Sequence, residues 1–108
     1  DVAVDLRRSS ATFGQWVGAE LSASNHRQLW VPMGFAHGFL TLSDTAEVLY
    51  KASGFWSQTC ERSLRWSDPE LAIAWPLERI GGSTPLLAEK DGVAPTLAQA
   101  LAAGELFE

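Results

Sequence analysis

The sequence predicts a mostly β fold, and two observations, the alternation of residues and the spacing of turns, support this prediction. Apolar and polar residues alternate with a period of two through the first two thirds of the chain, as expected for strands with one buried face. Turn-forming residues separate these segments at the short spacing that is typical of antiparallel sandwiches and barrels. The chain has a single cysteine, so no internal disulfide can take the place of a packed core. We therefore expect an antiparallel β-sandwich or barrel.

Six segments carry the strand pattern. The first places Val2, Val4 and Leu6 on one face. Later segments are separated by turns such as Pro32-Met33-Gly34 and Ser53-Gly54, whose residues favour tight changes of direction. The predicted strands are residues 2–6, 13–21, 29–31, 39–42, 48–50 and 64–66.

Two helical features follow the strands. The sequence DPEL at 68–71 predicts one short helical turn, which Ser67 or Asp68 can cap. Residues 95–104 are rich in alanine and leucine and predict a peripheral helix with Thr96 as its cap.

The chain is one domain at most, because 108 residues and 11.7 kDa suffice for a single hydrophobic core. It has no initial Met and enters the strand alternation at Asp1. We therefore expect residues 1–108 to be part of a single larger domain. We also expect an open barrel, and a chain that aggregates or needs a partner to stay in solution.

The composition excludes several classes of function. The net charge is −5 and the isoelectric point is near 4.9, with no basic cluster beyond Arg7-Arg8, which argues against nucleic-acid binding. No apolar run is long enough to span a bilayer, and the first residues lack a basic region followed by an apolar stretch, so we expect neither a membrane span nor a secretory signal. The lone cysteine is consistent with a reducing compartment, so a cytoplasmic protein is the default expectation. A small anionic ligand remains compatible with a few well-placed cations.

The most informative residue is His37, which lies between Gly34 and Gly38 among apolar neighbours. The glycines let a ligand approach the ring closely, which favours a site residue over a structural histidine. A metal site is not expected, because His26 lies in a polar turn-like stretch and supplies no second ligand beside His37. Tyr50 shares a strand face with Val48, so we expect it to point inward, either as a proton donor or as a core tyrosine.

Three further groups have both a functional and a structural interpretation. Phe55-Trp56 follows a glycine at an expected barrel rim, where a ring could stack on a base or sugar or simply pack. Glu61-Arg62 has the pattern of a surface ion pair. The run Glu89-Lys90-Asp91 has the pattern of a solvated turn.

Ordered motifs along nearly the whole chain resemble the dTDP-4-dehydrorhamnose 3,5-epimerase family. Several motifs at compatible spacing are far more specific than any one of them. They are DVAVDLR at 1–7, TFGQW at 12–16, RQLW at 27–30, GFAHGF at 34–39, AE at 46–47, LYK at 49–51, Trp66, DPEL at 68–71, WP at 75–76 and EKD at 89–91.

The resemblance implies a cupin-like jelly-roll homodimer that uses no cofactor. Such an enzyme inverts C3 and C5 of dTDP-4-dehydro-6-deoxyglucose in the pathway to dTDP-rhamnose. By position, Tyr50 resembles the family's proton donor, and Asp91 resembles the carboxylate that orients the catalytic histidine base. The positions that resemble substrate-binding residues are His37, Glu61, Lys90 and the Phe55-Trp56 pair, in which one ring would stack on thymine.

The chain departs from the family pattern in two places. The base histidine of the family lies in an Arg-Gly-Leu-His segment upstream of the position of Asp1, so we expect the isolated chain to be inactive. The family's Ser-Pro-Thr-Phe-Gly sequence reads SATFG at 10–14, which should affect local rigidity more than chemistry. Two alternatives remain: an epimerase that acts at one carbon only, and a catalytically inactive module that binds a nucleotide sugar.

Overall fold

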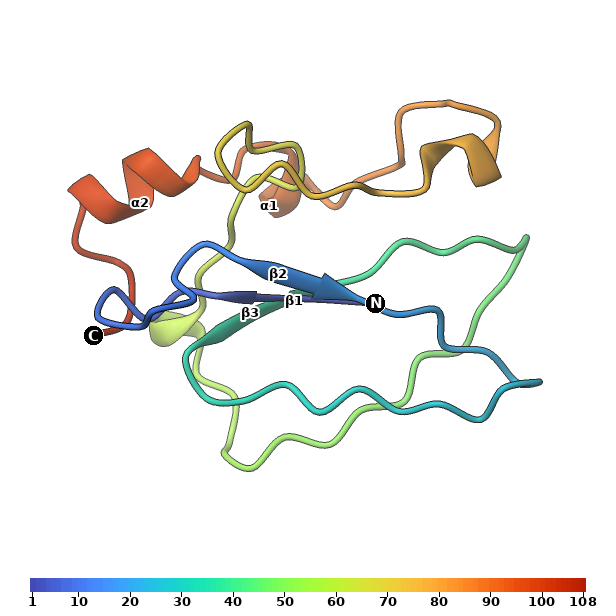
Figure 1. Cartoon of the computed structure of the whole chain (residues 1–108), viewed down its shortest axis with the longest axis horizontal. Helices are drawn as coiled ribbons and strands as arrows, with labels where there is room; N and C mark the ends of the chain where they lie inside the picture. Colours follow the sequence, from blue (N-terminus) through green and yellow to red (C-terminus); the bar gives the residue numbers. More distant parts are fainter.

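A three-stranded antiparallel sheet forms the centre of the computed structural model, which describes residues 1–108 (Figure 1). Strand β1 (Val2–Asp5) lies between β2 (Trp16–Gly18) and β3 (Phe35–Gly38). In this register Val2 lies opposite Gly18 on one side and Gly38 on the other. The central strand therefore has partners along both edges.

Strand β1 also supplies most of the hydrophobic core. All four of its residues are buried, and Leu6 continues the buried run. Leu71 and Leu97 pack against this strand from the C-terminal third of the chain, which lies over one side of the sheet in Figure 1. The core is small, since 11 of the 108 residues are buried.

Asp68 joins the last helix to the rest of the core. Its buried carboxylate accepts hydrogen bonds from the backbone amides of Glu70 and Leu71 within its own turn, and from the amide of Leu97 at 2.7 Å. Each hydrogen bond to a charged acceptor contributes about 1.5–3 kcal/mol. The prediction of Asp68 as the cap of a short turn is confirmed.

Helix α2 (Leu97–Ala102) forms inside the range predicted to be helical. Thr96 caps it with a capping box that is shared with Gln99, as expected from its hydroxyl at this position. The other helical elements are one turn each: the 3-10 helices η1 (Gln58–Cys60) and η2 (Leu77–Ile80), and α1 (Glu89–Gly92). No helix of the chain has the length and apolar character that crossing a membrane requires.

Most of the predicted strands are absent. The first is present over Val2–Asp5, and the second is reduced to Trp16–Gly18. The third observed strand covers 35–38, just before the predicted segment 39–42. No strand forms at 29–31, 39–42, 48–50 or 64–66, so these predictions are wrong for this chain.

The reason is the lack of pairing partners within the chain. A strand is stabilised by hydrogen bonds to a neighbouring strand, and alternation alone does not supply the neighbour. The chain has 37 hydrogen bonds between backbone groups, about half of the roughly 75 expected for a folded protein of this length. Residues 39–56, called the open segment below, take part in none of them and run as coil after β3 (Figure 1).

Candidate functional site

An ion pair joins two of the predicted site residues. Lys90 in α1 donates a hydrogen bond from Nζ to Oε1 of Glu61 at 2.5 Å, although the two residues are 29 positions apart in the sequence. This hydrogen bond, and then the charge of Glu61, raises the pKa of Lys90. Because both side chains are partly exposed, the pair remains accessible to a ligand.

Two more predicted residues lie near this ion pair. Asp91 follows Lys90 in α1 and is partly buried, and Tyr50 belongs to the open segment. The charges of both groups add, to a lesser degree than Glu61, to the raised pKa of Lys90. The structure therefore brings Glu61 together with Lys90 and its neighbour Asp91 from two separate parts of the chain.

The predicted inward orientation of Tyr50 is wrong for this chain. Its side chain is 76 % exposed, and Val48, on the same face in the sequence pattern, is also exposed. No strand forms at 48–50, so the alternation that predicted a shared inward face for the two residues does not apply here.

Phe55 and Trp56 also lie open to solvent. Phe55 is fully exposed and Trp56 is 73 % exposed, and neither ring stacks on another aromatic ring. The structure thus leaves both rings of this pair open to solvent.

His37 lies on β3 and has a partner that the sequence analysis missed. Its Nε2 is 2.5 Å from Oδ1 of Asp1. A carboxylate can only accept, so Nε2 carries the proton in this contact, and in the neutral ring Nδ1 keeps a free lone pair. Partial burial of the ring, and then the nearby N-terminal ammonium, lowers the pKa of His37, which favours the neutral form.

The strand register explains why Asp1 and His37 meet. His37 lies opposite Ala3 in the pairing of β1 with β3. Asp1 is two residues before Ala3, so it shares the same face and lies diagonally across from His37. The signal is present in the sequence, but it can be used only when the pairing of the two strands is known.

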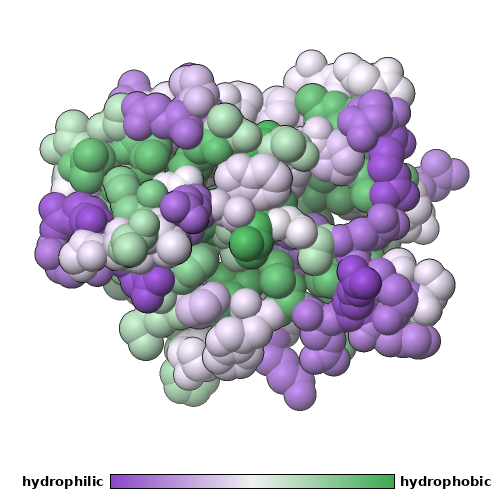
Figure 2. Space-filling view, in the orientation of Figure 1, coloured by the Kyte–Doolittle hydropathy of each residue, from purple (hydrophilic) through white to green (hydrophobic).

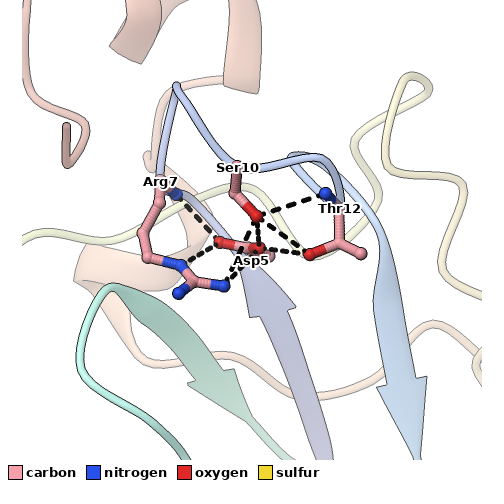
Figure 3. Close-up of polar contacts among 4 residues, drawn as sticks. All are labelled: Asp5, Arg7, Ser10 and Thr12. Carbon is pink, nitrogen blue, oxygen red and sulfur yellow. Dashed lines mark hydrogen bonds and ion pairs between the residues drawn. The ribbon is translucent and has the colours of Figure 1, made fainter.

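A second cluster, also missed, surrounds the buried carboxylate of Asp5 (Figure 3). Arg7 donates to it from both Nε and Nη2, at 2.9 and 2.8 Å, in the two-pronged geometry of guanidinium and carboxylate. The hydroxyl groups of Ser10 and Thr12 donate to Oδ2 at 2.6 and 2.5 Å. These donors, and Arg7 most of all, hold the pKa of the Asp5 carboxyl well below its usual range.

The same arginine connects β1 to the start of β3. Its guanidinium lies 5.0 Å from the centre of the Phe35 ring, within cation–π range. Gly34 is required beside it, because a Cβ there would lie 2.5 Å from Cγ of Arg7, and because φ is +89°. The cluster fixes the entry to the strand that carries His37, and all its buried polar atoms have partners.

Two clefts lie away from the predicted site residues. One, of about 250 Å³, is lined by Ala3, Thr12 and Phe35 among others, and the other, of about 380 Å³, lies between Trp66 and Leu77. No group of three or more His, Cys, Asp or Glu side chains is arranged to hold a metal ion. The candidate site is therefore an exposed surface and not an enclosed pocket.

The comparisons with known proteins identify one family. The family model for dTDP-4-dehydrorhamnose 3,5-epimerase matches residues 1–99. The dTDP-4-dehydrorhamnose 3,5-epimerase of Pseudomonas aeruginosa is 62 % identical over 91 residues, which are 84 % of this chain and 48 % of that protein. The chain spans about half the length of the curated relatives it matches.

Solved structures agree with this result. The dTDP-6-deoxy-D-glucose-3,5-epimerase of Legionella pneumophila, in complex with dTDP-4-keto-L-rhamnose, matches with a TM-score of 0.80 and 42 % identity over 99 % of this chain and 54 % of that one. An epimerase of Mycobacterium tuberculosis matches with a TM-score of 0.86 and 34 % identity over 99 % of this chain and 52 % of that one. These matches confirm the predicted mostly β, cupin-like fold. The chain belongs to the dTDP-4-dehydrorhamnose 3,5-epimerase family.

Proposed function

We propose that these 108 residues supply the proton donor and part of the substrate site of a dTDP-4-dehydrorhamnose 3,5-epimerase. The enzyme would invert C3 and C5 of dTDP-4-dehydro-6-deoxyglucose. The observation that carries the proposal is the ion pair of Glu61 with Lys90, which is followed by Asp91 in α1, in a chain of this family. Relatives named for this activity, and the Legionella structure with its bound dTDP-4-keto sugar, support the same substrate class.

The chemistry needs a base and an acid on opposite faces of the sugar. C3 and C5 both flank the C4 ketone, so removal of either α-proton gives an enolate whose oxygen carries the developing charge. Inversion follows when an acid returns a proton to the other face. Tyr50 is the proposed acid, and its exposed phenol is free to reach a substrate.

The proposed base is a histidine in a segment that these 108 residues do not include. Asp91 would accept a hydrogen bond from that histidine, which fixes its tautomer and stabilises its cationic form. His37 has a different proposed role, because its Nε2 proton is already donated to Asp1. Its free Nδ1 can accept a hydrogen bond from a sugar hydroxyl group.

The remaining residues would bind the nucleotide sugar. Lys90 and Glu61 can exchange part of their mutual ion pair for contacts with the substrate, since the pair is partly exposed. Phe55 or Trp56 offers an exposed ring on which thymine can stack. We further propose that the complete enzyme is a homodimer, as the family resemblance implies.

A chimera tests the proposed function. The matched 91 residues of the Pseudomonas aeruginosa epimerase are replaced by the corresponding residues of this chain, and the product is incubated with dTDP-4-dehydro-6-deoxyglucose in deuterated water. We expect deuterium at C3 and C5 in the chimera. Tyr50→Phe in the chimera should lower the rate by about 10²-fold or more, the usual contribution of a positioned acid.

Each of the alternative results of this experiment would contradict one part of the proposal. Deuterium at a single carbon would favour a monofunctional epimerase. Substrate binding by a folded chimera without any exchange would favour the inactive binding module. Full exchange in Tyr50→Phe would remove Tyr50 from the role of acid, and exchange at enzyme-like rates by the 108 residues alone would show that no outside base is needed.

A further inference from the structure

Two segments that are far apart in the sequence lie side by side at the candidate site. Residues 61–68 begin at Glu61, and residues 89–97 include Lys90, whose ammonium group pairs with the Glu61 carboxylate. This ion pair spans 29 positions of the sequence. It is one of three polar contacts between the two segments.

The other two contacts follow along the same segments. The backbone amide of Arg65 donates a hydrogen bond to the carbonyl group of Pro95 at 2.8 Å. The amide of Leu97 donates to Oδ2 of Asp68 at 2.7 Å, and this contact again spans 29 positions. The two segments therefore run in the same direction, with the ion pair at one end and Asp68 at the other.

Asp68 is the firmly held end of this arrangement. Asp68 and Leu97 are buried, whereas the side chains of Lys90 and Glu61 are 60 % and 36 % exposed. An exposed ion pair adds little net stability because water and salt screen it. A buried hydrogen bond to a carboxylate is stronger, and its loss leaves a buried donor without a partner. The place of the 89–97 segment is therefore fixed at Leu97 more than at Lys90.

Packing does little to hold α1. None of its residues is buried, and apolar residues (green) remain open to solvent across the middle of the molecule in Figure 2. Between α1 and Leu97 the chain has one buried residue, Ala94, whose amide donates to the carbonyl group of Asp91 at 3.4 Å. The end of α1 is thus tied to the short buried stretch that ends at Leu97. Release of Leu97 should displace α1, because few other contacts retain it.

We propose that Asp68 is a positioning residue for the candidate site. Its hydrogen bond to the amide of Leu97 holds α1 in place. Because Lys90 and Asp91 belong to α1, their positions relative to the substrate depend on this bond. The inference rests on the proposed function, in which Asp91 orients the base histidine.

The substitution Asp68→Asn removes this bond and little else. Oδ1 of Asp68 accepts hydrogen bonds from the amides of Glu70 and Leu71, and the carbonyl oxygen of asparagine can keep both. Its NH₂ group takes the place of Oδ2 and is a donor, so it cannot accept from the amide of Leu97. Asp68→Asn therefore changes the contact between the segments and preserves the turn.

The variants are made in a chimera in which the 108 residues of this chain replace the matched half of the Pseudomonas aeruginosa epimerase. We expect Asp68→Asn to lower kcat for deuterium incorporation at least about tenfold. It should also move the acidic limb of the pH profile of kcat/KM to lower pH. A displaced Asp91 stabilises the cationic base histidine less, so the pKa of that histidine falls. Asp91→Asn should move the limb in the same direction.

Thr96→Ala is the matched control. It removes the side-chain cap of α2, the helix that begins at Leu97, but leaves the bond from Leu97 to Asp68 in place. We expect this variant to keep the acidic limb of the parent chimera and a kcat within about twofold of it.

A double variant shows whether Asp68 acts through Asp91. In a chimera that already carries Asp91→Asn, the addition of Asp68→Asn should lower kcat by no more than about twofold, because the group that it positions is gone. A merely structural role would lower kcat by the same factor in both backgrounds.

Amide hydrogen exchange tests the positioning without catalysis. In the parent chimera the amides of Ala94 and Leu97 should open together as denaturant is added, as parts of one cooperative unit. Asp68→Asn should raise both exchange rates at least about fivefold. The measurement on the parent stands even where Asp68→Asn does not fold. An inactive parent chimera would contradict the proposed function, whereas exchange would still decide whether Asp68 holds the end of α1.

Three results would overturn the inference. One is independent opening of Ala94 and Leu97 in the parent chimera. Another is an Asp68→Asn chimera with the kcat and the acidic limb of the parent. The third is an equal loss of kcat with and without Asp91→Asn.

Discussion

The paired sheet and the open segment differ in how their polar groups are satisfied. In the paired sheet, β1 is hydrogen-bonded along both edges and its Asp5 carboxylate is surrounded by donors from Arg7, Ser10 and Thr12. In the open segment, no backbone group pairs with another backbone group, and large apolar side chains face solvent. The paired sheet is thus stabilised by its own residues, whereas the order of the open segment depends on what covers it.

The residues that we propose to form the site divide between these two regions. His37 is held on β3 by its register with β1 and by the carboxylate of Asp1. Tyr50, Phe55 and Trp56 lie in the open segment, where the chain fixes them least. Catalytic geometry requires side chains that are held by their surroundings, and this chain alone does not hold the proposed site residues of the open segment in this way.

The largest expected effect comes from breaking the paired sheet at Asp5. Asp5→Ala removes the acceptor of hydrogen bonds from Arg7, Ser10 and Thr12 and leaves the Arg7 guanidinium without its partner. Loss of one partner of a buried charged network is strongly destabilising. We expect the thermal midpoint of unfolding to fall by roughly 10 °C or more, measured by circular dichroism.

Asp44→Ala is the matched control for this substitution. Asp44 is an exposed carboxylate in the open segment, and no hydrogen bond or ion pair involves its side chain. Its removal should shift the midpoint by no more than about 1–2 °C. Equal effects of the two substitutions would contradict the distinction between the two regions.

The paired sheet should also respond to pH through His37. The pKa of this residue is lowered in the folded chain, so the unfolded chain binds more protons once the pH falls below about 6.5. The contribution of His37 to the free energy of unfolding is therefore present above a pH of about 6.5, and it is lost as the pH falls through the lowered pKa. Since the side chain is 35 % exposed, the expected fall in the thermal midpoint is small, about 1–3 °C.

His37→Gln isolates this effect from that of the carboxylates. Glutamine does not titrate, so the difference in midpoint between the parent chain and this variant should change between about pH 7.5 and about pH 5.5. The parent chain should lose more stability than the variant over this range. A difference that stays constant, or that changes in the opposite direction, would contradict the lowered pKa.

The sequence predicted local features, such as the caps of turns and helices, better than it predicted the pairing of strands. Asp68 as a turn cap and Thr96 as a helix cap depend on neighbouring residues only, and both predictions are confirmed. The strand at 48–50 depends on a partner strand, which alternation cannot reveal, and it does not form in this chain.

The same distinction applies to the candidate site. The family resemblance made Lys90 and Asp91 candidates, whereas the pattern of EKD at 89–91 alone indicated a solvated turn. Neither predicted the ion pair of Lys90 with Glu61, which links residues 29 positions apart. Asp1 and Asp5 were missed because their partners become neighbours only through strand register and the turn after β1. Contacts of this kind cannot be deduced from the spacing of residues along the chain.

The smallest expected effect is at Leu49. This effect tests directly whether the open segment is less tightly packed than the paired sheet. Leu49 is 94 % exposed, so Leu49→Ser should change the free energy of unfolding of the isolated chain by no more than about 0.5 kcal/mol. The same substitution at Leu71, which is 5 % exposed in the core, should cost about 3 kcal/mol or more. Urea denaturation of the two variants measures both values. A loss at Leu49 comparable to that at Leu71 would mean that the open segment is already packed in the isolated chain, which would contradict the contrast between the two regions.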